Sequence, residues 1–383
     1  MEPLNLDELQ SLAQQRLSKM AFDYIAGGAE DERTLRENRE AFWRLKLRPR
    51  VLAGVEEPDL KTTVLGTPID LPVLLAPVAM HCLAHPEGEL ASARAAAAAH
   101  TIMLLSTTST YSLEDVAQAA TGPKWFQLYC YRDRSISLRL IERAQQSGYT
   151  ALCVTVDTPR LGRREADIRN HFQLPPGLSI KNVERVGLEQ MPEGQSDSAL
   201  AAYAATMMAR SLSWDDLAWM RESCDLPLVL KGIMTAEDAK LAVEHGASAI
   251  IVSNHGGRQL DGVSASIEVL PEIVEAVDGQ IEVLFDSGVR RGTDVLKALA
   301  LGANAVLVGR PYIWGLALEG EAGVKRVLAM LKDELELAMA LAGCATVEAI
   351  GPQTVSREHS AGHGGGVDES HGGGIGPHSG PYY

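Results

Sequence analysis

Eight short runs of nearly continuous apolar residues alternate along the chain with segments of helical periodicity. Strands buried on both faces of a parallel sheet have this continuous apolar character. The runs are Val73–Ala79, Thr101–Thr107, Trp125–Cys130, Ala151–Thr158, Leu228–Ile233, Ala249–His255, Ile281–Asp286 and Ala305–Gly309. Helical patterns, several opened by Ser, Thr or Asp, cover Gly88–His100, Ser135–Ser147, Thr235–His245, Arg291–Leu301 and Val324–Leu341. The alternation predicts an α/β fold, a single (β/α)8 TIM barrel, with a doubly wound open sheet as the alternative.

Two segments depart from this alternation. Residues 161–212 join a strand to the next helix over far more residues than most loops use, and we interpret them as a mobile lid at a strand end. In residues 356–383, glycine triplets alternate with histidines, which predicts a disordered tail. Flexible spacing gives those histidines no fixed ligand geometry, so no metal site is expected. The barrel is expected to span residues 1–355.

Composition and charge indicate a well-packed protein that does not bind nucleic acid or anionic membranes. Of the 383 residues, 46% are hydrophobic and 22% charged, which suits a large packed core. The formal net charge of -15 opposes binding to nucleic acid and to anionic membranes, so local arginines must meet any anionic ligand. The five cysteines have no paired spacing, and we find no signal peptide or membrane-spanning run. We therefore expect a cytoplasmic protein with reduced thiols.

The predicted strands end in polar residues. In a barrel of this kind the ligand site lies at the carboxyl ends of the strands, and several of these residues are two apart, which would place them on one inward face. In chain order they are Ser106, Gln127, Tyr129, Thr155, Asp157, Lys231, Ser253, His255, Asp286, Gly309 and Arg310. Any one of them could merely satisfy a backbone group, but together they predict a polar pocket.

The last two strands are followed by glycine and arginine. Asp286-Ser287-Gly288-Val289-Arg290-Arg291-Gly292 and Gly309-Arg310-Pro311 each lead into a predicted helix. Backbone N–H groups at a helix start and guanidinium groups both suit phosphate oxygens, and phosphates bind at this position in many barrels. No Gly-x-Gly-x-x-Gly motif opens a helix after a strand, which argues against a nicotinamide cofactor.

His255 is the candidate general base. It stands at a predicted strand end, and Asp157 on another strand could form a carboxylate–imidazolium pair with it. Arg258 follows in the same loop, Arg164 opens the predicted lid, and Lys231 could neutralise negative charge on a cofactor. A lone histidine is more often structural, but this setting favours catalysis.

With these residues assembled, the chain resembles the FMN-dependent 2-hydroxy-acid oxidase family, which includes glycolate and lactate oxidases and mandelate dehydrogenases. The resemblance covers nearly everything before the tail. The segments that carry it are Phe22-Asp23-Tyr24, Phe126-Gln127-Leu128-Tyr129, residues 157–167, Leu230-Lys231-Gly232-Ile233-Met234-Thr235 and residues 253–261.

The resemblance implies that FMN is the cofactor and assigns residues to each of its parts. The FMN ring would contact the backbone of Ala76, Pro77, Val78 and Ala79 and the side chains of Ser106, Gln127, Thr155 and Lys231. The ribityl chain would contact Ser253 and Asp286, with Ser287 and Gly288 beside it, and the phosphate would contact Arg290, Gly309 and Arg310. Where relatives usually have Asp-Gly-Gly, this chain has Asp286-Ser287-Gly288.

The resemblance also implies the substrate contacts. Tyr24, Arg164 and Arg258 would bind the carboxylate and Tyr129 the hydroxyl, while His255 accepts a proton and Asp157 stabilises the imidazolium. Plant glycolate oxidases have tryptophan and threonine where this chain has Thr108 and Val78. The smaller Thr108 predicts that L-lactate or a longer L-2-hydroxy acid is preferred over glycolate.

Several alternatives share these features. We expect O2 to be the electron acceptor, with H2O2 as product, but a quinone or cytochrome acceptor would need the same catalytic residues. An FMN-barrel isomerase would bind flavin without net oxidation, and a catalytically silent barrel could bind a phosphorylated metabolite. Soluble relatives are usually homotetramers, so the same assembly is expected.

Overall fold

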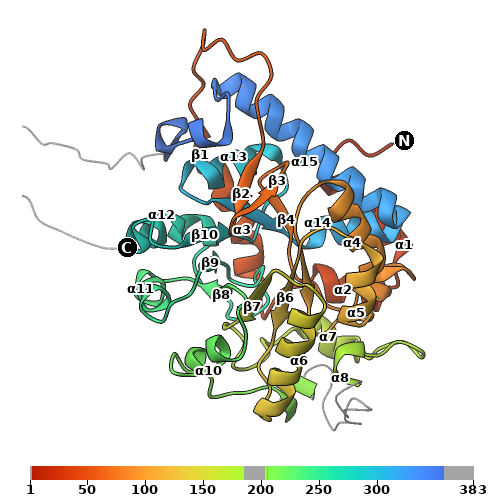
Figure 1. Cartoon of the computed structure of the whole chain (residues 1–383). Coiled ribbons are helices and arrows are strands. Elements are labelled where there is room, and N and C mark those ends of the chain that lie inside the picture. The colour runs from red at the N-terminus through yellow and green to blue at the C-terminus, as the bar shows by residue number, and fades with distance from the viewer. Residues whose placement is uncertain (1, 185–202, 205, 358–383) are drawn as a thin grey trace, which may run out of the picture.

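Eight parallel strands form a closed barrel at the centre of the protein (Figure 1). The computed structural model describes residues 2–184, 203–204 and 206–357. The strands are β4 (Val73–Leu75), β5 (Met103–Ser106), β6 (Lys124–Leu128), β7 (Ala151–Thr155), β8 (Leu228–Ile233), β9 (Ala249–Val252), β10 (Glu282–Phe285) and β11 (Ala305–Val308). Each pairs with the next along the chain, and β11 pairs with β4. This closure confirms the predicted barrel and excludes the open sheet.

Aliphatic side chains fill the barrel interior. Residues such as Leu104, Ile251 and Leu307 form one buried cluster there, as expected where strands have both faces covered. Val64 and Ile69, from the hairpin of β2 (Thr62–Val64) and β3 (Thr67–Ile69), belong to the same cluster. The hairpin also bonds to Glu282 at the start of β10, so it closes the end where the strands begin. The polar residues at the carboxyl ends of the strands lie at the opposite end of the barrel.

Helices cover the outside of the barrel (Figure 1). They are α4 (Gly88–Ala98), α5 (Leu113–Ala119), α6 (Arg134–Gln146), α10 (Asp216–Glu222), α11 (Ala236–Glu244), α12 (Ser266–Val277), α13 (Gly292–Ala300), α14 (Arg310–Glu319) and α15 (Glu321–Ala342). Side chains of Ser112, Asp133 and Thr235 cap the first turns of α5, α6 and α11, which explains where these helices begin. All five predicted helical segments are helical, with ends that differ by less than one turn.

The sequence patterns did not resolve the segment before the barrel. It forms α1 (Leu6–Arg16), α2 (Lys19–Ala26) and α3 (Arg33–Trp43), with asparagine and serine caps on the first two. β1 (Leu45–Leu47) pairs with β12 (Val355–Arg357), so the fold includes Ser356 and Arg357, the first two residues of the predicted tail. Three short 3-10 helices, η1 (His81–Leu83), η2 (Val347–Ala349) and η3 (Pro352–Thr354), complete the described chain.

The predicted lid is described at its two ends. It contains α7 (Glu165–Arg169) and α8 (Lys181–Glu184), and its last part contacts the segment after β6, where Arg132 N donates to Met207 O at 3.0 Å. Residues 185–202 and 205 of the lid, and residues 358–383 of the tail, lie outside the described residues. Within the described chain no helix is long and apolar enough to cross a membrane. Nor do the described residues bring three potential metal ligands together.

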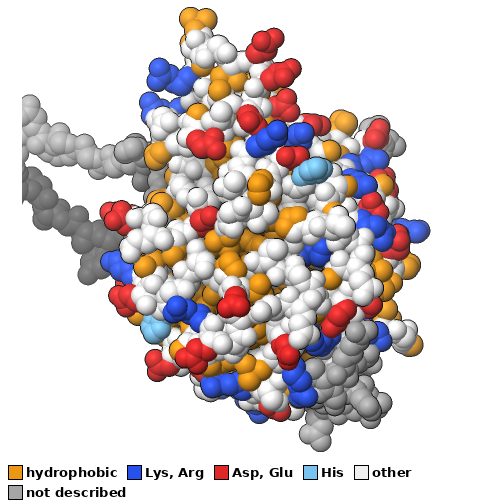
Figure 2. Space-filling view, in the orientation of Figure 1, with side chains coloured by type: hydrophobic (Ala, Val, Ile, Leu, Met, Phe, Trp, Pro, Cys, Tyr) orange, Lys and Arg blue, Asp and Glu red, His pale blue; other side chains and the backbone are white. Residues whose placement is uncertain are grey.

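The loop between β1 and β2 projects from the body of the protein (Figure 1). Figure 2 shows hydrophobic side chains on this projection. Within the loop, Val51 and Leu52 are 82% and 102% exposed. These two neighbouring side chains are the most exposed large hydrophobic residues of the described chain, so this loop is a candidate contact surface.

Candidate active site

A cavity of about 1280 Å³, including its open mouth, lies at the carboxyl end of the barrel strands. Nearly all the site residues predicted from strand ends, from loops and from the family resemblance line it. They are Tyr24, Ala76, Pro77, Val78, Ala79, Ser106, Thr108, Tyr129, Thr155, Arg164, Lys231, His255, Arg258, Asp286, Ser287, Gly288, Arg290, Gly309 and Arg310. The other three, Gln127, Asp157 and Ser253, do not line the cavity and instead hydrogen-bond residues that do.

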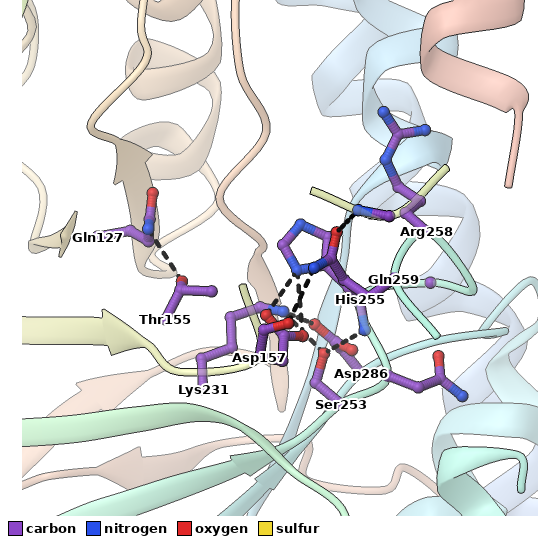
Figure 3. Close-up of polar contacts among 12 residues, drawn as sticks. Gln127, Thr155, Asp157, Lys231, Ser253, His255, Arg258, Gln259 and Asp286 are labelled. Atoms are coloured by element: carbon purple, nitrogen blue, oxygen red, sulfur yellow. Dashed lines mark hydrogen bonds and ion pairs between the residues drawn. The ribbon is translucent and has the colours of Figure 1, made fainter. Parts of the chain in front are cut away.

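The imidazole of His255, which lines the cavity, contacts the carboxylate of Asp157 behind it (Figure 3). The imidazole Nδ1 lies 3.0 and 3.1 Å from the two carboxylate oxygens of Asp157. Nδ1–H therefore donates to the carboxylate, which leaves Nε2 as the proton acceptor. Burial lowers the pKa of His255 more than Asp157 raises it, so the resting imidazole is neutral. The arrangement is that of a general base.

Asp157 stays ionised behind the imidazole. Burial alone would raise the pKa of this carboxyl. Interaction with His255, which attracts the carboxylate when protonated and donates a hydrogen bond to it, and the charge of Lys231 lower the pKa overall. Once His255 accepts a proton, the carboxylate stabilises the imidazolium that forms.

The inward placement of His255 has a different local cause from the predicted one. Strands β7 and β9 end at Thr155 and Val252, so the two-residue period does not extend to Asp157 and His255. His255 instead has a left-handed backbone with φ of +59°. Asp157 fits only because Gly232 stands opposite: a Cβ at Gly232 would lie 2.7 Å from Asp157 Cβ. An isolated glycine in a strand pattern signals such a close approach.

The ammonium group of Lys231 contacts two polar side chains near the base (Figure 3). Its Nζ donates to Ser253 Oγ at 2.7 Å and lies 2.9 Å from Asp286 Oδ2. Although burial opposes the charged form, the Asp286 and Asp157 carboxylates raise the pKa of Lys231 above its ordinary value. The backbone N–H of His255 also donates to Ser253 Oγ, so one hydroxyl fixes both the cation and the base.

Ser287 occupies a backbone conformation that usually takes glycine. Its φ is +84°, and its hydroxyl donates to Asp286 Oδ1 at 2.7 Å and accepts from Gly256 N at 3.1 Å. The hydroxyl therefore links the loop after β10 to the loop that carries His255. Gly288 must remain glycine, because a Cβ there would lie 2.0 Å from the Asn38 carbonyl.

A second polar network lies across the ends of β5, β6 and β7. Gln127 accepts from Ser106 Oγ at 3.2 Å through Oε1 and donates from Nε2 to Thr155 Oγ1 at 2.9 Å. All three residues are buried. Buried polar side chains that satisfy one another are held rigidly, so Ser106 and Thr155 present defined hydroxyl groups to the cavity.

Two arginines and two tyrosines line the cavity together with His255. Arg164 is 7% exposed, and burial together with the positive charge of Arg258 lowers its pKa to about 10. The Arg258 guanidinium lies 5.1 Å from the centre of the Tyr24 ring, which stacks on Phe172. Burial raises the pKa of Tyr24 and of Tyr129, so both phenols keep their protons. The site offers N–H and O–H donors to one anion.

The part of the cavity lined by Arg290 and Arg310 suits a phosphate. Burial lowers the pKa of Arg290 to about 10, and its Nε is buried without a hydrogen-bond partner among the described residues. Arg310 starts α14, and burial with three neighbouring arginines lowers its pKa well below the ordinary value. An anion would satisfy the free donor and offset this repulsion, so the residues fit the phosphate end of FMN.

Sequence reasoning missed the contribution of residues 25–27. The carbonyl of Ile25 accepts from Arg310 Nε at 3.0 Å, and that of Gly27 accepts from Arg310 Nη2 at 3.0 Å and Arg258 Nη1 at 2.7 Å. The end of α2 thus orients both arginines. Backbone carbonyls carry no residue identity, so no sequence motif could have indicated these contacts.

Comparison with known proteins agrees with this geometry. Residues 13–357 match the family model described as FMN-dependent dehydrogenase. The chain is 54% identical to glycolate oxidase of Spinacia oleracea, covering 94% of this chain and 96% of that protein. It is 55% identical to L-lactate oxidase of a Nostoc species, covering 91% and 96%. A solved structure of mandelate oxidase with (S)-4-hydroxymandelic acid superposes with a TM-score of 0.88 at 45% identity, covering 92% of this chain and 98% of that one.

These matches span the barrel, the arginine site and the histidine loop together. They confirm the predicted family, its FMN cofactor and its general reaction, the oxidation of a 2-hydroxy acid. The chain belongs to the FMN-dependent dehydrogenase family.

Proposed function

We propose that this protein oxidises a small L-2-hydroxy acid, preferably L-lactate, to the 2-oxo acid and passes the electrons to O2 with formation of H2O2. One observation carries the proposal: a neutral His255, paired with Asp157 at 3.0 Å, shares one cavity with buried Arg164 and with Arg258. A proton acceptor beside a carboxylate site is what a 2-hydroxy acid requires.

Different side chains would bind the substrate carboxylate, orient the substrate and accept its proton. Arg164 and Arg258 bind the substrate carboxylate, and the protonated Tyr129 and Tyr24 add hydrogen bonds that fix its orientation. His255 Nε2 accepts a proton from the substrate, while Asp157 stabilises the resulting positive charge. Bound FMN supplies the two-electron acceptor. Residues Arg290 and Arg310 would hold its phosphate, and Lys231 would lie beside its ring.

The preference for lactate follows from the wall near the substrate. Thr108 and Val78 both line the cavity. The Thr108 hydroxyl lies 3.0 Å from Ser106 Oγ, so the Thr108 side chain is hydrogen-bonded to the wall of the cavity. A short side chain leaves space for the methyl group of lactate. Thr108→Trp should therefore lower kcat/KM for L-lactate more than for glycolate. A strong preference of the unmodified enzyme for glycolate would contradict the assignment.

The choice of O2 as acceptor is supported by relatives that are named oxidases and match at 54% and 55% identity. Stopped-flow reoxidation of the reduced enzyme by O2 tests it. Reoxidation too slow to sustain turnover, with fast reoxidation by a quinone, would instead assign a dehydrogenase.

Anaerobic titration with L-lactate tests the reaction itself. The purified protein should be yellow and should bleach. A yellow protein that no 2-hydroxy acid bleaches would point to an isomerase, and a colourless protein that FMN cannot reconstitute would point to a silent barrel.

We also propose that the protein is a homotetramer. The exposed Val51 and Leu52 in the loop between β1 and β2 would provide an apolar contact for another copy. Light scattering on the wild type should give the tetramer mass, and Leu52→Asp should give smaller species. A monomeric wild type would reject the proposal.

A further inference from the structure

Helix α7 contains a buried carboxyl group to which the reaction above assigns no role. Asp167 is 4% exposed, and its Oδ2 is buried without a hydrogen-bond partner among the described residues. It lies three residues after Arg164, the residue that precedes α7. An unsatisfied buried carboxyl is costly unless nearby charges compensate for it.

The compensating charges are the two substrate arginines. Burial raises the pKa of Asp167, and Arg258 and Arg164 are the groups that oppose this rise. Asp167 in turn offsets the repulsion that Arg164 experiences from Arg258. The interaction of Asp167 with the pair acts through the field of the charges, without a direct hydrogen bond to its Oδ2 from any described residue.

The other carboxylates near the site already have partners. Asp157 pairs with His255, and Asp286 pairs with Lys231 at 2.9 Å. Asp23 bonds to Lys19 and accepts from Asn170 at 2.7 Å. Asp167 is therefore the counter-charge of the arginine pair among the described residues.

We propose that Asp167 is a specificity-determining residue that reduces the charge of the carboxylate site from two positive charges to one, and so selects monocarboxylates over dicarboxylates. The inference rests on the proposed function, because it takes Arg164 and Arg258 as the carboxylate site. One bound carboxylate neutralises a site with one net charge. A second carboxylate on the same ligand then gains no attraction but still loses hydration.

Removing the negative charge of Asp167 should therefore increase the affinity for anionic ligands, and the increase should depend on the charge of the ligand. Electrostatic energy is proportional to ligand charge, so a factor gained by a monoanion is squared for a dianion. Asp167→Asn should tighten the binding of propionate about 5-fold and that of malonate about 25-fold. The 5-fold factor corresponds to a repulsion of about 1 kcal/mol between Asp167 and one bound carboxylate. Damage to the fold would weaken both ligands instead.

The experiment measures dissociation constants of propionate and malonate for the FMN-loaded enzyme from changes in its flavin absorbance. Glu165→Gln is the matched control. It removes the same charge from the same helix, but Glu165 is 39% exposed and pairs with Arg169 at 2.6 Å. Solvent screens such a charge, so this variant should bind both ligands as the wild type does.

A second variant and the wild type alone also test the proposal if Asp167→Asn does not fold. Asp167→Ser should show the same charge dependence, and the wild type alone should bind malonate no more tightly than propionate. In a variant that folds and binds FMN as the wild type does, weakening of both ligands, no change, or equal tightening of the two would overturn the proposal. Binding is read without turnover, so a failure here is distinct from a failure of L-lactate to bleach the flavin.

Discussion

Replacing Asp157 with Asn tests the central electrostatic claim, that a carboxylate stabilises the protonated base. Asn has nearly the same shape and can still accept from His255 Nδ1, so the geometry should persist while the charge is lost. A hydrogen bond between charged partners contributes about 1.5–3 kcal/mol, and burial of this pair places it in the upper part of that range. The rate of flavin reduction should fall by about 40- to 150-fold.

Anaerobic stopped-flow reduction by L-lactate measures this rate directly. Affinity for propionate should not change, because Arg164 and Arg258 keep their contacts. Asp157 raises the pKa of His255, so its removal should also move the acid limb of kcat/KM to lower pH. Flavin reduction within about threefold of the wild type, with FMN content and thermal stability unchanged, would refute the claim that Asp157 stabilises the imidazolium.

The same geometry makes three further predictions. His255→Gln should retain FMN while flavin reduction slows by about 10²- to 10⁴-fold, and near wild-type reduction would place the base elsewhere. In the wild type, kcat/KM should begin to fall only below about pH 6.5, because burial lowers the pKa of His255 and the base is lost when it binds a proton; an acid limb above that pH would contradict the shift. Gly232→Ala places a Cβ 2.7 Å from Asp157 Cβ at a φ of +115°, so it should cost about 1–3 kcal/mol in unfolding experiments and slow flavin reduction; an unchanged unfolding midpoint would argue against the close contact.

The sequence by itself determined the barrel and most of its site. Continuous apolar runs are required of strands buried on both faces, so the eight strands were visible in the pattern. The ends of parallel strands meet at one edge, which is why the positions of polar residues such as Thr155 and Lys231 along the chain were enough to assign them to one cavity.

Tertiary structure alone decided how these residues act. Asp157 and His255 are 98 residues apart, and their contact depends on a left-handed backbone at His255 and on the space left by Gly232. The carbonyl of Gly27 orients Arg258 and Arg310, and the buried Asp167 opposes the charge of the arginine pair. Periodicity reports which face of an element is buried. Backbone carbonyls, positive φ angles and long-range charge have no periodic signature, so only the folded chain reveals them.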